Sequence, residues 1–251
     1  MLKSAPSQSR GPLGVILKPM TLQELTLNIF AERILTTFDS KKLVNWAVEV
    51  ILLGYESENL YLLAGLDFES TEEREKYFIE SLKDLQIEIE TDEEKLIENY
   101  AITLSKKVVE KEVDIDYGFK QMLKIVTASD YDQKYIPFFE IDEDLDYLRY
   151  DNNTIFNYGL TLENYKEFIL EEFKIFLEME TLKIPSEERK KCYCEKCNKL
   201  NVPITKTKYQ LKKPFKFSVW SCGLCGSTKL KFNNNHEVKK LIIKEFKKNY
   251  A

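Results

Sequence analysis

Residues 192–197 read CYCEKC and residues 222–225 read CGLC, and together they hold all five cysteines of the 251-residue chain. Cys194 and Cys197 have the C-x2-C spacing, as do Cys222 and Cys225. Each pair can close a tight turn that presents two thiolates to one ion, and four thiolates complete the tetrahedron that zinc prefers. The sequence therefore predicts a Zn2+ site made of Cys194, Cys197, Cys222 and Cys225.

The 24 residues between the two cysteine pairs have the pattern of a β-hairpin. Residues 203–211 form one predicted strand, and residues 214–221 a second, in which apolar and polar side chains alternate. Residues 227–232 predict a third strand. Two cysteine knuckles joined by antiparallel strands resemble the zinc-ribbon family across residues 192–232. This resemblance implies a small β module organised around one ion.

The fifth cysteine and the only histidine have no place in this four-ligand set. Cys192 is one residue from Cys194, so both cannot serve one knuckle in the usual geometry, and we interpret Cys192 as the first residue of a strand or a spare ligand. His236 is predicted to lie in the first turn of a terminal helix.

The ligand set indicates a structural ion. A catalytic zinc keeps one position open for water, whereas four cysteines close the site. A module of roughly 40 residues buries too little apolar surface to fold alone, and zinc can contribute on the order of 10 kcal/mol to its folding. Redox chemistry is the lesser alternative, because neither pair opens a helix after a strand as a thioredoxin-type pair does.

Charge divides the chain into two segments. Residues 186–251 hold 17 Lys and Arg against 5 Asp and Glu, whereas residues 1–185 hold 20 against 37. The net charges are +12 and −17, although the whole chain carries only −5. We therefore predict an acidic domain over residues 20–185 and a basic domain over residues 186–251, with the boundary near Pro185.

The acidic segment has the pattern of about seven helices with short connections. Thr21 and Glu24 have the spacing of a capping box before a helix, and so do Thr91 and Glu94. Little strand signal interrupts these helices, so the predicted fold is mainly α: a helical bundle or stack of helical hairpins, then the zinc-ribbon β module and a terminal helix. Residues 131–153 are aromatic and acidic without a helical period, and predict either a solvated loop or a partner-binding loop.

The N-terminal residues and the apolar runs bear on location. GPLG at residues 11–14 has the form of an affinity-tag remnant, so residues 1–19 are predicted to be a tag or linker and Met20 the native start. No apolar run reaches the roughly 20 residues of a membrane span, and no secretory signal is apparent. We expect a cytoplasmic protein, in which clustered cysteines bind metal rather than form disulfides.

Two stretches of the acidic segment carry a second resemblance. LVNWAVEVILLGYESENLYLLAGL at residues 43–66 and DIDYGFKQMLKI at residues 114–125 resemble small uncharacterised helical proteins of bacteria, some encoded near toxin–immunity or phage-defence loci. The resemblance covers roughly residues 40–180 and carries no catalytic motif. It implies a protein partner, as for an immunity protein.

The basic segment has three possible roles: docking on its own acidic segment, binding nucleic acid, or binding another protein. Its candidate contacts with nucleic acid or an acidic partner are Lys206, Lys208, Lys216, Trp220, Lys229, Lys231, Lys239 and Lys240. Only Arg189 among its 17 basic residues is an arginine, which disfavours reading of base sequence.

The sequence lacks the usual signatures of an enzyme. It has no glycine-rich phosphate loop, no HExxH motif and no nucleophile with a plausible histidine. We expect a non-enzymatic protein that recognises a protein partner, and the resemblance implies a toxin–immunity or defence system as its setting. The alternative is a nucleic-acid-binding regulator that uses the lysine-rich ribbon.

Overall fold

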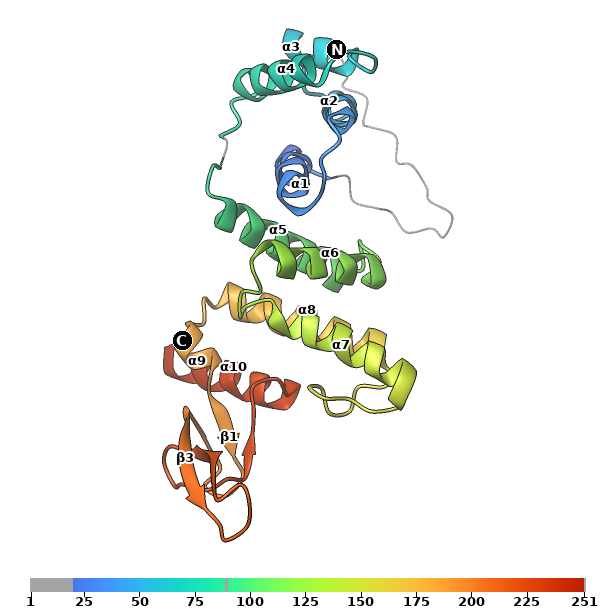
Figure 1. The fold of residues 1–251 in the computed structure, drawn as a ribbon. Coiled ribbons are helices and arrows are strands. Elements are labelled where there is room, and N and C mark those ends of the chain that lie inside the picture. The colour runs from blue at the N-terminus through green and yellow to red at the C-terminus, as the bar shows by residue number, and fades with distance from the viewer. Residues whose placement is uncertain (1–19, 89, 251) are drawn as a thin grey trace. The chain divides into compact units, whose positions relative to one another are not determined.

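The computed structural model describes residues 20–88 and 90–250, which form two compact units (Figure 1). Unit 1 consists of the described residues up to Asp114 and of residues 127–130; unit 2 consists of residues 115–126 and 131–250. The described residues are mostly helical, with a small antiparallel β module before the terminal helix, which confirms the predicted fold class. Residues 1–19, the predicted tag or linker, lie outside the described residues.

Unit 1 is a helical assembly in which α1 to α4 share an apolar core. Its helices are α1 (Leu22–Leu35), α2 (Lys41–Leu52), α3 (Glu58–Ala64), α4 (Thr71–Asp84) and α5 (Glu93–Val109). Buried side chains of α1 to α4 meet around Trp46 and Phe78, whose rings lie edge to face with centroids 4.9 Å apart. Helix α6 (Ile115–Ala128) follows and contributes residues to both units.

The two predicted capping boxes have different outcomes. At the start of α1, Glu24 N donates to Thr21 Oγ1 at 3.2 Å and Thr21 N donates to Glu24 Oε2 at 2.8 Å, as predicted. The second prediction is wrong, because Asp92 rather than Thr91 caps α5 and accepts from the backbone N–H groups of Glu94 and Lys95. A carboxylate caps as well as a hydroxyl and also complements the helix dipole.

The prediction of a loop over residues 131–153 is also wrong, because helix α7 (Ile136–Asp151) occupies most of it. Pro137 lies in the first turn, where its missing N–H costs no helical hydrogen bond. The buried face steps by three and four residues through Phe138, Ile141, Leu145 and Leu148. Interspersed acidic residues concealed this period in the sequence.

One of those acidic residues, Asp144, has a structural role. Its carboxylate is fully buried and accepts hydrogen bonds from the backbone N–H groups of Ile155, Phe156 and Asn157. The Asn157 side-chain amide adds a further bond at 3.0 Å. Asp144 thus ties the segment that follows α7 back onto the helix.

The rest of unit 2 consists of three helices and two small sheets. The helices are α8 (Tyr165–Thr181), α9 (Ser186–Arg189) and α10 (His236–Tyr250). One sheet has the order β2-β1-β5, formed by β1 (Cys192–Cys194), β2 (Lys199–Asn201) and β5 (Leu230–Lys231). The other is the antiparallel hairpin of β3 (Pro203–Tyr209) and β4 (Lys216–Cys222).

Helix α10 packs against α8 and holds the β module in unit 2. Buried apolar residues of the two helices form one cluster, against which the partly buried Tyr193 of β1 and Leu200 of β2 also pack. The charge boundary near Pro185 therefore falls inside unit 2, between α8 and α9. Separate folding of the segments on either side of it stays a prediction. None of the helices in the described residues could cross a membrane by length and apolar character.

We expect Asp144→Asn to lower the free energy of unfolding by about 3 kcal/mol, because an amide loses the charge-assisted bonds and turns a donor toward the backbone N–H groups. Urea unfolding followed by circular dichroism measures the change. The control is Asp146→Asn, whose exposed carboxylate pairs with the exposed Arg149, an ion pair worth less than about 1 kcal/mol. Equal losses in both variants would contradict the assignment.

Candidate metal centre

Four thiol groups of the β module converge on one point. The sulfur atoms of Cys194, Cys197, Cys222 and Cys225 all lie within 4.8 Å of one another. Cys194 Sγ is 3.6 Å from Cys225 Sγ, and Cys197 Sγ is 3.8 Å from Cys222 Sγ. A tetrahedron with zinc–sulfur bonds of ~2.3 Å has edges of about 3.8 Å. The cluster could therefore hold one metal ion, as in a zinc-ribbon-like site.

The two cysteine pairs sit on equivalent turns. In the first, Asn198 N donates to Cys194 O at 2.8 Å and Asn198 has a φ of 55°. In the second, Gly226 N donates to Cys222 O at 2.9 Å and Gly226 has a φ of 71°. A left-handed residue directly after each pair turns the chain away and leaves both sulfurs on the inside, and asparagine and glycine adopt this conformation most readily.

Asn201 connects the two halves of the site, and the sequence analysis missed it. Its side chain is buried, its Oδ1 accepts from Gly223 N at 2.8 Å and its Nδ2 donates to Cys192 O at 3.4 Å. A Cβ at Gly223 would lie 2.8 Å from Val202 O, so only glycine permits this close approach. No local spacing signals this role, because Asn201 and Gly223 lie on different strands or turns of the module.

The β module has no apolar core of its own. Between residues 192 and 232, all of which the structure describes, the buried side chains are those of Cys192, Cys194, Asn201, Ser221 and Cys222. Three thiols, an amide and a hydroxyl cannot supply the burial that folds a domain. The ion that the thiols would hold is therefore the main source of stability that this module can have.

The thiols differ in their readiness to ionise. The backbone N–H of Cys197 lowers the pKa of Cys194 to about 6, whereas burial and the neighbouring thiols raise the pKa of Cys197 to about 12. Binding of an ion requires all four as thiolates, so it would release protons, among them that of Cys197. A set of four thiolates leaves no position for a reacting water, which matches a structural ion.

The fifth cysteine and the only histidine lie outside the four-thiol cluster. Cys192 is buried as the first residue of β1, beside Asn201 of β2, and is not one of the four clustered thiols. Burial raises its pKa, which keeps it protonated. His236 begins α10, as predicted; its Nε2 lies 2.9 Å from Glu172 Oε2 and its ring lies on Phe168 with centroids 4.1 Å apart.

The candidate contact residues fall into two groups. Lys231, Lys239 and Lys240 are engaged within the chain, by Glu237 at 3.3 Å, Glu172 at 2.6 Å and Glu171 at 2.6 Å respectively. The others are exposed on the hairpin or just after it and have no ion pair within the described residues: Lys206, Lys208, Lys216 and Lys229, together with Trp220.

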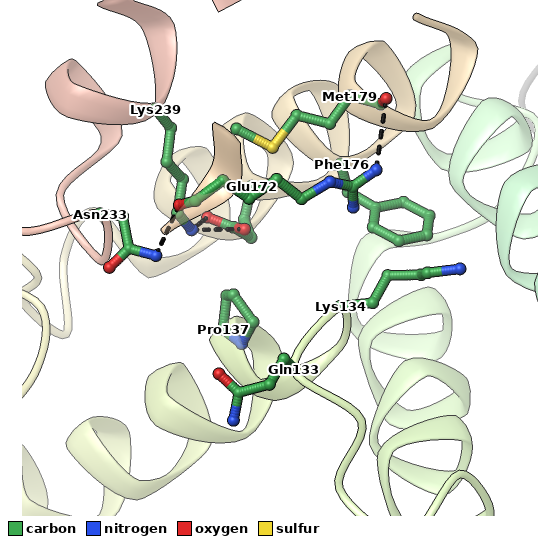
Figure 2. Close-up of a pocket in the computed structure, with 9 residues that line it drawn as sticks. Gln133, Lys134, Pro137, Glu172, Phe176, Met179, Asn233 and Lys239 are labelled. Carbon is green, nitrogen blue, oxygen red and sulfur yellow. Dashed lines mark hydrogen bonds and ion pairs between the residues drawn. The ribbon is translucent and has the colours of Figure 1, made fainter. Parts of the chain in front are cut away.

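Lys239 belongs to a buried charge cluster between α8 and α10 (Figure 2). Its ammonium lies 2.7 and 2.6 Å from the two carboxylate oxygens of Glu172, and both side chains are almost fully buried. Burial alone would raise the pKa of Glu172, but Lys239 and His236 outweigh it and lower the pKa to about 2. Glu172 and Lys239 line a pocket together with Arg189, which pairs with the buried Glu180.

Helix α10 thus docks through its lysines on the acidic α8. Besides Lys239 and Lys240, Lys247 reaches Glu178 at 2.6 Å. Self-docking, the first of the three possible roles, accounts for these lysines of the terminal helix. It does not account for the lysines of the hairpin.

No family model, curated protein or solved structure matches this chain. The resemblance of the helical segment to uncharacterised bacterial proteins accordingly has no support from these comparisons. The zinc-ribbon resemblance is supported by the thiol geometry alone.

We expect Cys197→Ser and Cys222→Ser to lose the bound ion and unfold the β module, because three thiolates no longer close the site and no apolar core replaces it. Cys192→Ala is the matched control and should keep one ion per chain. Elemental analysis gives the metal content, and amide-resolved NMR shows whether residues 192–232 unfold while the helices persist. Equal damage from all three changes would mean that Cys192 is a ligand.

We expect Glu172→Gln to destabilise unit 2 by about 3 kcal/mol, because Lys239 then lies buried without a counter-charge. The folded pKa near 2 is below the ordinary value of 4.5, so this carboxylate stabilises the fold above pH 4.5 and less as pH falls toward 2. Urea unfolding at pH 7 and pH 3 should show a smaller difference between wild type and variant at pH 3.

Glu178→Gln is the control for this experiment, because its pair with Lys247 is half exposed. It should cost less than about 1 kcal/mol. A Glu172→Gln effect that is equally large at both pH values would contradict the role of its charge.

Proposed function

We propose that this chain is a non-enzymatic, cytoplasmic binding protein whose zinc-stabilised hairpin β3–β4 contacts nucleic acid. One observation carries the proposal: residues 196–236 contain nine lysines and no Asp or Glu, and the hairpin lysines have no ion pair within the described residues. A run of cations without internal counter-charges attracts a polyanion. The terminal helix, whose lysines are engaged by α8, serves to mount the hairpin.

The register of the hairpin supports this use. Lys206 pairs with Val219 and Lys208 with Phe217, so these two lysines project from one face, while Lys216 pairs with Tyr209 on the other. Lys212 and Lys213 are exposed at the tip. Positive charge therefore surrounds the hairpin on both faces and at its end, an arrangement that suits a phosphate backbone.

A bound Zn2+ would fix the end of the hairpin at which β3 begins and β4 ends. Cys222 ends β4 and pairs with Pro203, the first residue of β3, so the predicted ion is bound where the hairpin begins. A two-stranded hairpin alone is marginally stable in water. With four thiolates on one ion, the hairpin would project from a rigid support, and most of its side chains, those of Ser221 and Cys222 excepted, are exposed or partly exposed to a partner.

The lysines favour contact without sequence preference. Lysine binds phosphate as a point charge, whereas base edges are usually read by the planar forks of arginine or by amides. The hairpin and its tip offer no arginine. Binding that depends on salt and not on base sequence follows from this composition.

A protein partner is the second candidate, and an observation on unit 1 favours it. Residues 43–75 contain eight carboxylates, no lysine and one arginine, the buried Arg74. The same stretch exposes large apolar side chains, among them Leu52, Tyr61 and Phe68 at 75%, 51% and 98%. Exposed apolar side chains among charges of one sign suit a basic protein partner.

A toxin–immunity or defence setting for such a partner is a hypothesis that rests on the sequence resemblance. The neighbouring genes test it, since an adjacent toxin or effector gene with a basic product is expected. Neighbours unrelated to toxins or defence would remove the basis for this setting and leave the hairpin proposal untouched.

For the hairpin, we expect the double variant Lys206→Gln/Lys208→Gln to weaken nucleic-acid binding and flatten its salt dependence. Removing two phosphate contacts should reduce the slope of log K against log salt by about 1.4 for single strands. Fluorescence anisotropy with labelled oligonucleotides of mixed sequence, at about 50 to 200 mM salt, measures both the affinity and the slope.

The matched control is Lys240→Gln/Lys247→Gln, which removes the same charge from lysines engaged by Glu171 and Glu178. It should leave the slope unchanged. No binding by the wild type at low salt would rule out the nucleic-acid proposal, and an equal effect of both double variants would rule out the hairpin as the contact.

A further inference from the structure

We infer that the hairpin binds single-stranded rather than duplex nucleic acid, with Trp220 and Tyr209 as stacking platforms for bases. This inference rests on the proposed nucleic-acid function and names the class of ligand. It starts from a feature that lysine–phosphate contacts leave unexplained, which is the number of apolar and aromatic side chains exposed on this module.

The β module exposes an unusual amount of apolar surface. Eight of its large hydrophobic side chains are exposed: Val202, Ile204, Tyr209, Leu211, Phe215, Trp220, Leu224 and Phe232. Trp220 is 55% exposed and Tyr209 77%, although both lie within strands. Aromatic rings held on a strand in this way lose little conformational freedom on binding, and clusters of them mark interaction sites.

The strand register gathers two of the rings on one face. Trp220 lies opposite Thr205, and Tyr209 lies opposite Lys216. Residues directly opposite each other share a face, and every second residue along a strand returns to it. Thr205, Thr207 and Tyr209 therefore lie on the same face as Trp220, Ser218 and Lys216.

We call this face of the hairpin, from Trp220 to Tyr209, the track, because short side chains lie between its two rings. Thr205 and Tyr209 are four residues apart along β3, so the backbone positions that carry the rings of Trp220 and Tyr209 are roughly 13 Å apart along the hairpin. Only the short side chains of Thr207 and Ser218 lie between them. Phe232 extends the track at one end, since its ring is 6.5 Å from that of Trp220 in an edge-to-face arrangement.

Lysines border the track. Lys216 lies on the track beside Tyr209, while Lys206 and Lys208 project from the opposite face of a ribbon whose strands are only about 5 Å apart. Long lysine side chains from the opposite face can therefore reach its edges. An extended strand on this face would place bases on the rings and phosphates near the ammonium groups.

The same surface suits a duplex poorly. In a duplex the bases are already stacked on each other and present only their edges in the grooves, which are read by arginine and amide side chains. A duplex would use the lysines and leave the exposed rings without contacts. A single strand uses both, and each base stacked on an aromatic ring is worth about 5- to 150-fold in affinity.

The chain contains its own reporter for this contact. It has two tryptophans; Trp46 is 3% exposed in the core of unit 1, and Trp220 is exposed on the track. Titration of the full, metal-loaded chain with an oligothymidylate should therefore quench the fluorescence of Trp220. A duplex with the same number of phosphates should bind more weakly and change the emission little.

Trp220→Ala should lower single-strand affinity about tenfold or more and leave both the salt slope and duplex binding unchanged. Trp220→Phe, which keeps a ring, should restore most of the affinity and guards against a folding defect. Metal content and the circular dichroism spectrum confirm that each variant is folded.

The outcomes separate the two proposals. Equal binding of duplex and single strand, or an unchanged affinity in Trp220→Ala, overturns the stacking inference but leaves nucleic-acid binding by the lysines in place. Absence of binding to either ligand at low salt overturns both. Equally tight binding of an acidic polypeptide such as polyglutamate and of the oligonucleotide would also overturn the stacking inference. The rings would then add nothing specific to bases.

Discussion

The convergence of four thiols is the interaction on which the C-terminal part of this chain depends. Between residues 192 and 232 the buried groups are three thiols, an amide and a hydroxyl, so burial of apolar surface cannot account for the fold of this module. Its hydrogen bonds pair β1 with both β2 and β5, and β3 with β4, but sheets of two or three short strands are weak on their own. The four thiolates, together with an ion that they could hold, would take the place of a core. Because no side chain is needed to fill an interior, the hairpin is free to expose rings and lysines.

A second interaction decides which basic residues remain available. Lysines of α10 meet carboxylates on α8, and the pair of Lys239 with Glu172 is buried among the apolar residues that join the two helices. Breaking such a pair is costly even where forming it gains little, so it specifies how α10 lies on α8. Some lysines of the C-terminal segment, on α10, thus pair with carboxylates of α8, whereas those of the hairpin have no ion pair within the described residues. The amino-acid composition does not distinguish these two groups of lysines.

What the sequence could predict follows from how local each feature is. The cysteine pairs, the hairpin between them and the cap at Thr21 depend on spacings of a few residues, and the structure has all three. The hairpin strands are shorter than or shifted from the predicted residues 203–211 and 214–221, and β2 was not predicted. Helix α7 was missed because Asp144 lies on its buried face, where an acidic residue breaks the apolar period unless distant N–H groups satisfy it. The role of Asn201 and the internal ion pair of Lys239 were missed for a similar reason. Their partners, Gly223 and Glu172, are adjacent only once the chain has folded.

The net charge of −5 is a poor guide to what this chain attracts. At physiological ionic strength charges separated by more than about 8 Å are largely screened, so a ligand responds to the nearest residues and not to the total. Near the hairpin those residues are lysines without an Asp or Glu between positions 196 and 236, and along residues 43–75 they are carboxylates with one buried arginine. The first stretch is uniformly positive over a length greater than the screening distance, and the second carries eight carboxylates against Arg74. The two stretches would therefore attract ligands of opposite charge, and rising salt would weaken both attractions.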